Sequence, residues 1–187
     1  MNEKLLQQAI AMFDSQEKWD AFLELWNLRS PICDKWKWGL INRLRHLFVS
    51  TVDTNKWQFN HFNDGVRIYP KELGLDHMEV RIKINERMGS LWINPNIYDS
   101  VKVRQMIQNH HIVMPLLKGF EYNNDWDIWS KPFDNDICAS TLDSSCYIWG
   151  HDTERVAKVL FETYIKPFMT DEIADFFVKV SEESKKQ

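Results

Sequence analysis

The apolar residues of this chain follow two different periods, and each period keeps to its own part of the sequence. In residues 1–50 and again in residues 152–180, apolar side chains recur every three or four positions, which is the spacing of amphipathic helices. In residues 55–94 they alternate with polar side chains, as they do in strands that bury one face. Helices and strands in separate blocks predict an α+β fold, because a parallel sheet would need strands and helices in alternation.

The strand block predicts an antiparallel meander. Its clearest strand is Met78–Ile84, where apolar and charged side chains alternate, and a turn signal around Gly65 precedes it. Two aromatic strand candidates, Trp126–Phe133 and Cys146–Trp149, lie in a loop-rich region at residues 126–149. We therefore expect a sheet of about four to six strands, packed by the N-terminal and C-terminal helices.

The helical blocks carry their own start signals. Asp14, with Glu17 three residues later, predicts one helix start within the first block, and Ser30-Pro31, a cap residue followed by proline, predicts another. These two signals divide the block into three helices. One more helix is expected at residues 99–110, and the polar tail from Ser181 to Gln187 is expected to be frayed. The sequence has no internal repeat or low-complexity linker, so residues 1–187 are interpreted as a single domain.

The composition argues against several function classes. The six glycines are scattered singly, without the GxGxxG or GxxxxGK[ST] loops that cradle phosphate, so no cofactor is expected. Cys33, Cys138 and Cys146 lack metal-ligand spacing and are interpreted as structural thiols. The polar start of the chain and the lack of an 18-residue apolar run predict a cytoplasmic protein without a signal peptide or membrane span. The oligomeric state stays open.

An acidic aromatic segment at residues 121–136 is the first candidate binding surface. It carries five acidic residues against Lys131, and the chain contains nine tryptophans, a residue type favoured as a binding anchor. A basic protein partner would complement such a surface, whereas a solvated loop with its tryptophans in the core is the alternative. The predicted partner-binding residues are Glu121, Tyr122, Asp125, Trp126, Asp127, Trp129, Asp134 and Asp136.

A basic stretch at residues 29–46 is the second candidate surface, with a local charge of +4. Basic side chains interleaved with tryptophans are typical of nucleic-acid binding, and the residues concerned would be Lys35, Lys37, Arg43 and Arg45. The whole chain has a net charge of −4, which favours the simpler interpretation that these residues form the solvent side of an amphipathic helix.

A metal-dependent nuclease is the sharpest enzymatic alternative. Asp64 and Asp76 precede Glu79, which resembles in part the PD-(D/E)XK pattern of an acidic residue followed on the next strand by Glu-x-Lys. The pattern departs where the lysine is needed, because Arg81 stands there, and no Pro-Asp precedes it. A charged, solvated sheet face made of Glu79, Arg81 and Lys83 explains the same residues without chemistry.

The adjacent His110 and His111 point about 100° apart on a helix and are interpreted as surface or helix-end residues rather than metal ligands. No catalytic residue is therefore predicted. The sequence favours a non-catalytic protein-interaction domain with the character of an immunity, inhibitor or counter-defence protein, which engages a basic partner through its acidic aromatic surface.

Overall fold

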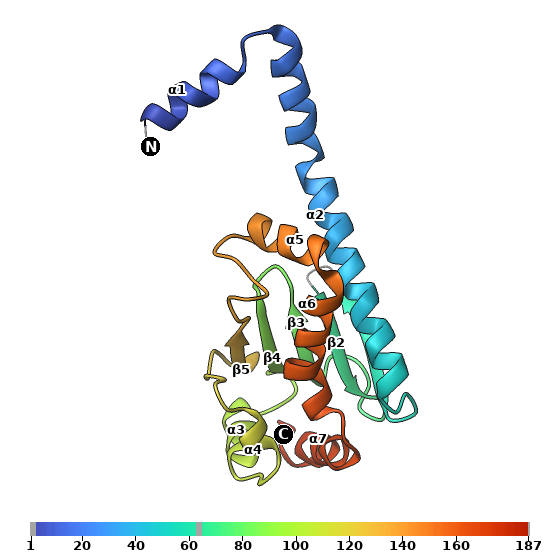
Figure 1. Ribbon diagram of the computed structural model, residues 1–187. Helices are drawn as coiled ribbons and strands as arrows, with labels where there is room; N and C mark the ends of the chain where they lie inside the picture. The colour runs from blue at the N-terminus through green and yellow to red at the C-terminus, as the bar shows by residue number, and fades with distance from the viewer. Residues whose placement is uncertain (1–2, 63–64, 187) are drawn as a thin grey trace.

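The structure is a computed structural model that describes residues 3–62 and 65–186 (Figure 1). Helices and strands occupy separate blocks of the chain, which confirms the predicted α+β class. In chain order the elements are α1 (Glu3–Met12), α2 (Gln16–Thr51), β1 (Trp57–Phe62), β2 (Gly65–Pro70), β3 (Met78–Lys83), β4 (Met88–Ile93), α3 (Ser100–Gln108), α4 (Val113–Leu116), β5 (Asp127–Pro132), α5 (Leu142–His151), α6 (Thr153–Leu160), the π-helical turn η1 (Phe161–Ile165), the 3₁₀ turn η2 (Lys166–Phe168) and α7 (Asp171–Glu183).

The five strands form one antiparallel sheet in the order β1-β2-β3-β4-β5, so the predicted meander is confirmed. The register pairs Phe59 with Ile68 and Val80 with Leu91, which places apolar residues of neighbouring strands side by side on one face. The β4–β5 ladder has a bulge after Leu91, and the loop that carries α3 and α4 connects these two strands.

One face of the sheet packs against the helices and forms the core. The C-terminal half of α2, called its proximal half below, lies against α5 and α6 (Figure 1). In addition, η1 contacts β3 and α7 contacts β2. Leu44 of α2 and Leu160 of α6 are fully buried there, as are Ile68 and Ile82 of the sheet. Within the described residues, no helix is long and apolar enough to cross a membrane.

The opposite face of the sheet is not the solvated charged face that the alternating pattern suggests. Glu79 is fully buried, and its Oε2 accepts a hydrogen bond from Nε of Arg81 at 2.6 Å. Lys83 donates from Nζ to Oδ2 of the buried Asp127, also at 2.6 Å. The Arg81 guanidinium lies 3.5 Å above the centre of the Trp92 ring. Aromatic and charged side chains of this face therefore bury one another, which is why the prediction of a solvated face is wrong.

Two local predictions of secondary structure are also wrong. The helix α2 continues through Pro31 without a break, and Cys146–Trp149 lies in the helix α5 rather than in a strand. Thr141 caps α5 by accepting a hydrogen bond from the Ser144 amide at 3.2 Å, and the buried Cys146 and Trp149 then fall three residues apart on one face. A four-residue apolar run does not by itself distinguish these two structures.

The C-terminal tail is ordered rather than frayed as far as Lys186, and Gln187 lies outside the described residues. The helix α7 extends to Glu183, and the fully buried Ser184 follows it. The backbone amide of Asp99 donates to the Ser184 carbonyl, and the amide of Lys186 donates to the Ile97 carbonyl, both at 2.9 Å. The tail therefore pairs with the segment between β4 and α3, which supplies backbone partners that the polar side chains do not reveal.

Candidate functional site: an exposed apolar helical arm

Residues 3–32 extend away from the rest of the structure as a helical arm (Figure 1). We call the remaining described residues the body. The arm consists of α1 and the distal half of α2, with α1 folded over at its far end. Apart from Phe13, every residue of the arm whose side chain is described is exposed. The rest of α2 packs on the body, so one continuous helix has a covered half and an uncovered half.

Local interactions fix the bend between α1 and α2. Ser15 caps α2 by accepting a hydrogen bond from the Lys18 amide at 3.3 Å. The ring of Phe13 lies 5.1 Å from that of Trp19 and 4.9 Å from that of Phe22, measured between centroids. A hydrophobic contact across a helix start of this kind sets the angle at which the chain enters the helix. The arm is therefore a bent pair of helices with a small aromatic cluster of its own.

The arm carries most of the large apolar side chains that the structure leaves in solvent. Of the eighteen exposed large apolar residues in the described part of the chain, ten lie in the arm: Leu6, Ile10, Met12, Trp19, Phe22, Leu23, Leu25, Trp26, Leu28 and Ile32. Leu25 is 66% exposed and Trp26 is 57% exposed. So many exposed large apolar side chains on one part of a monomer are uncommon and indicate a site of interaction.

These side chains form two stripes on α2. Trp19, Leu23 and Trp26 continue the stripe that faces the body farther along the helix. Leu25, Leu28 and Ile32 lie on the other side of the helix, away from the body. A helix that only covers its own domain carries one apolar stripe, so the second stripe on α2 is unexplained by the fold.

A groove lies in the angle between α1 and α2, with a volume of about 570 Å³. This is within the usual range for ligand-binding pockets, but the lining is apolar except for Lys18 and contains no nucleophile or acid–base pair. Its lining residues are Ala9, Met12, Phe13, Lys18, Ala21, Phe22 and Leu25. The groove therefore suits the docking of apolar side chains and offers no chemistry.

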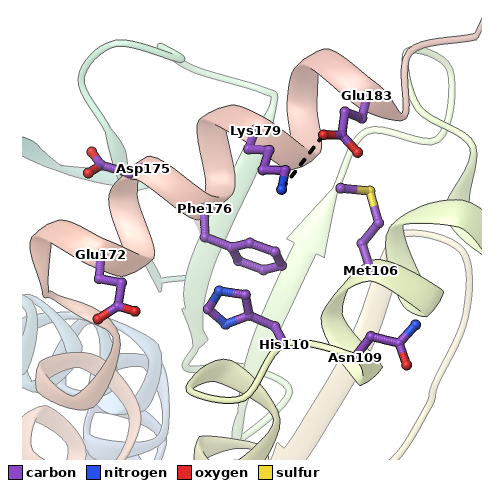
Figure 2. Close-up of a pocket in the computed structure, with 8 residues that line it drawn as sticks. All are labelled: Met106, Asn109, His110, Glu172, Asp175, Phe176, Lys179 and Glu183. Atoms are coloured by element: carbon purple, nitrogen blue, oxygen red, sulfur yellow. Dashed lines mark ion pairs between the residues drawn. The ribbon is translucent and has the colours of Figure 1, made fainter.

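A second hollow, between α3 and α7, has a volume of about 480 Å³ (Figure 2). The His110 ring stacks on Phe176 with 3.8 Å between centroids, and its Nδ1 accepts a hydrogen bond from the Val113 amide at 3.2 Å. Burial lowers the pKa of His110, and the neighbouring His111 lowers it further. Lys179 pairs with Glu183, and Figure 2 shows the carboxylates of the hollow pointing apart rather than toward a common point. This arrangement does not assemble a catalytic or metal-binding group.

The acidic aromatic segment does not form one surface. Asp127 and Trp129 are buried in β5. Glu121, Tyr122, Asp125 and Trp126 are exposed before the strand begins, while Asp134 and Asp136 are exposed after it ends. The strand therefore separates the predicted partner-binding residues into two exposed groups with a buried pair between them.

Three of the four exposed acidic residues of that segment, Asp125, Asp134 and Asp136, have side-chain partners within the chain. Asp125 accepts hydrogen bonds from Ser100 Oγ at 2.8 Å and from Tyr122 Oη at 3.1 Å. Asp134 lies 3.7 Å from Nζ of Lys131, and Asp136 lies 3.6 Å from a guanidinium nitrogen of Arg155. These interactions offset part of the local negative charge that the sequence pattern emphasises.

The four basic residues predicted as a nucleic-acid stripe lie on the proximal half of α2, and three of them meet groups of the chain itself. Lys37 pairs with Asp34 at 2.8 Å, Arg43 with Glu154 at 2.6 Å, and Arg45 lies 3.2 Å from Nδ1 of His61. Lys35 is exposed. The stripe is thus divided between the edges of α2 rather than gathered on one face.

The acidic residues of the nuclease alternative do not assemble within the described part of the chain. Asp64 lies outside the described residues. Asp76 pairs with Arg67 at 3.0 Å, and the carboxylate of Glu79 accepts a hydrogen bond from the Asp76 amide at 2.9 Å while it pairs with Arg81. Across residues 3–62 and 65–186, no group of three or more His, Cys, Asp or Glu side chains is placed to hold a metal ion.

Sequence reasoning missed the arm because it assigned every apolar stripe to the core. The signal was nevertheless present, since Leu25, Leu28 and Ile32 repeat at helical spacing on a side of the helix that the first stripe leaves polar. Two stripes on one helix indicate two separate contacts.

Searches of family models, of curated proteins and of solved structures found no match to this chain.

Proposed function

We propose that this chain is a protein-interaction domain that docks through its helical arm. The observation that carries the proposal is the set of ten exposed large apolar side chains on the arm. They are spread along both helices of the arm, as the contacts of a standard protein–protein interface are spread over ~800 Å² of each partner. A surface of this size fits a protein partner better than a small ligand.

The residue types on the arm support the same function. Trp19 and Trp26 are aromatic anchors of the kind that dominate binding energy at protein interfaces. Acidic residues lie near them in the sequence, because residues 14–28 contain Asp14, Glu17, Asp20 and Glu24 against Lys18, a local charge of −3. The partner that complements this surface carries apolar residues flanked by basic side chains.

The proposed partner thus has the basic character that the sequence pattern favours, but the arm rather than residues 121–136 provides the main contact. Tyr122 and Trp126, which are 45% and 43% exposed, form a smaller secondary contact in this proposal. An immunity, inhibitor or counter-defence role is compatible with it, because such proteins act by occupying a partner surface.

Site-specific photocrosslinking in native extract tests this function. A benzoylphenylalanine at Leu25 of the arm is compared with one at Lys158, an exposed position of α6 on the body. We expect a discrete protein adduct from position 25 and none from position 158. Adding Trp26→Ser and Leu28→Ser, one substitution in each stripe, to the position-25 variant should remove the adduct. An arm position that gives no more adduct than position 158 would contradict the proposal.

A further inference from the structure

We propose that the second apolar stripe of the arm is covered by α2 of a second copy of this chain, laid antiparallel along the side of the helix that faces away from the body. The inference rests on the proposed function and names its partner. Three features of α2 carry it: the spacing of its second apolar stripe, the freedom of that side of the helix, and the distribution of charge along its length.

The second stripe has the spacing of a two-helix seam. Ala21, Leu25, Leu28 and Ile32 follow one another at intervals of four, three and four residues. This is the heptad pattern with which two helices pack side chains into one another. Leu25 and Leu28 are 66% and 50% exposed, so the seam is open. A partner helix, rather than a strand or a loop, matches this spacing.

The side of α2 that carries the stripe stays free beyond the arm. The body-facing side of the proximal half is buried at Leu40, Leu44 and Phe48. The stripe, extended at heptad spacing, reaches Lys35 and Gly39 on the opposite side, and both residues are exposed. A second helix can therefore lie along the stripe without displacing any element of the body, and at Ala21 and Leu25 it enters the groove that these residues line together with α1.

The charges along α2 favour the antiparallel direction. Residues 14–28 have a net charge of −3, whereas residues 29–46 have a net charge of +4. A parallel pair would place like charges beside each other, and an antiparallel pair places the acidic half of each copy beside the basic half of the other. With Leu25 opposite Leu28 of the second copy, Lys35 at the extension of the stripe in one copy lies near Glu17 of the other.

Sedimentation velocity on the purified full chain, from low micromolar to 200 µM, is the direct test. We expect a species with twice the 22.4 kDa chain mass. Leu25→Glu with Leu28→Glu should weaken the dimer at least tenfold, because two charges enter the seam of each copy. The matched control is Val101→Glu, which introduces glutamate at a half-exposed apolar position of α3. This substitution should leave the dimer unaffected.

Charge reversal tests the direction of the pair. Glu17→Lys alone and Lys35→Glu alone should each weaken the dimer, and an equal mixture of the two variants should restore it, because every cross pair in the mixed dimer is again of opposite sign. Single reversals without effect, or a mixture that stays as weak as its components, would overturn the antiparallel arrangement.

The outcomes separate this inference from the proposed function. A chain that remains monomeric at 200 µM overturns self-association, yet the proposed function survives if position 25 still gives an adduct with another protein. A dimer that tolerates the Leu25 and Leu28 changes also overturns the inference, since its interface lies elsewhere. Circular dichroism and urea unfolding of each variant establish that the body remains folded, which the exposure of the substituted positions leads us to expect.

Discussion

The two halves of α2 resemble each other in apolar content and differ completely in burial. In the proximal half, Leu40 and Leu44 are fully buried and Phe48 is 1% exposed. In the distal half, Leu25 and Trp26 are more than half exposed. An apolar stripe shows that a helix face is to be covered, but it does not show whether the cover is supplied by the same chain or by another. In α2, the body covers the apolar stripe of the proximal half only.

The body and the arm also differ in what they contribute to the stability of the fold. The body buries its large side chains and thereby gains most of its stability, since fully burying one large apolar side chain contributes about 1.5–3 kcal/mol. The arm has no such contribution from its own domain. Isolated helices shorter than about 12–15 residues are marginal in water, so the arm depends on its cap, its aromatic cluster and its continuity with the proximal half of α2.

The largest expected difference between the two regions concerns tryptophan. Trp149 is fully buried and donates from Nε1 to the Ile137 carbonyl at 2.7 Å. Trp149→Ala should lower the free energy of unfolding by about 3–5 kcal/mol, because it leaves a cavity and an unpaired carbonyl. Trp26→Ala should change it by no more than about 0.5 kcal/mol under conditions where the chain is monomeric. Urea unfolding followed by circular dichroism measures both, and equal losses would break the comparison.

Ion pairs should show the same contrast on a smaller scale. Glu79→Gln leaves the Arg81 guanidinium, which is 13% exposed, without its counter-charge and should cost about 3 kcal/mol. Asp14→Asn removes the pair with Lys18 on the arm, where both side chains are more than half exposed, and should cost less than about 0.5 kcal/mol. Chemical denaturation at low and high salt compares the two. A strong salt dependence of the Glu79→Gln effect would argue against a buried pair.

Two glycine substitutions compare a tightly packed position in the sheet, Gly89, with an open position on α2, Gly39. A Cβ at Gly89 would lie 2.2 Å from the Tyr164 ring, which is held by a hydrogen bond from its hydroxyl to the Pro132 carbonyl, so Gly89→Ala should cost about 2 kcal/mol. A Cβ at Gly39 would meet nothing within 4 Å, and Gly39→Ala should stabilise α2 by about 0.5–1 kcal/mol. Melting temperatures should therefore move in opposite directions. A loss of stability in Gly39→Ala would show that this side of α2 is covered.

The smallest effect is expected at the two adjacent histidines. Burial lowers the pKa of His110 below its usual value, while the His111 side chain is 81% exposed. The unfolded chain therefore binds more protons than the native chain below pH 6.5, so the contribution of His110 to stability is lost as the pH falls through its unfolded pKa toward its native one. His110→Phe should reduce the acid sensitivity between pH 7 and pH 5, and His111→Asn should reduce it less, because the neighbouring His111 lowers the pKa of His110 less than burial does. NMR titration of the His110 ring checks its lowered pKa directly.

Much of the fold could be predicted from the sequence because its signals are local. The alternation through β3 and the helical spacing at both ends of the chain specify the α+β class and the antiparallel sheet without long-range information. The break expected at Pro31 is wrong because a proline start signal is outweighed by helical sequence on both sides. The order of the C-terminal tail depends on backbone pairing with residues about 85–90 positions earlier, which no local pattern contains.

The candidate site could be predicted only in part. Acidic and aromatic residues at 121–136 suggest a surface, but the strand β5 buries Asp127 and Trp129, and that burial depends on Lys83 and on the neighbouring strand. The apolar residues of the arm are visible in the sequence, whereas their exposure is not. Whether a stripe is covered depends on where the body ends, and the body ends partway along α2.

The continuity of α2 has a mechanical consequence. The helix is anchored in the body around Leu40, and the start of the helix at Gln16 is about 36 Å farther along its axis at 1.5 Å per residue. A tilt of only about 5° at the anchor therefore moves the far end by about 3 Å over that length. Because α5 and α6 contact α2 at the anchor, a small change in their packing produces a larger displacement at the far end of the arm.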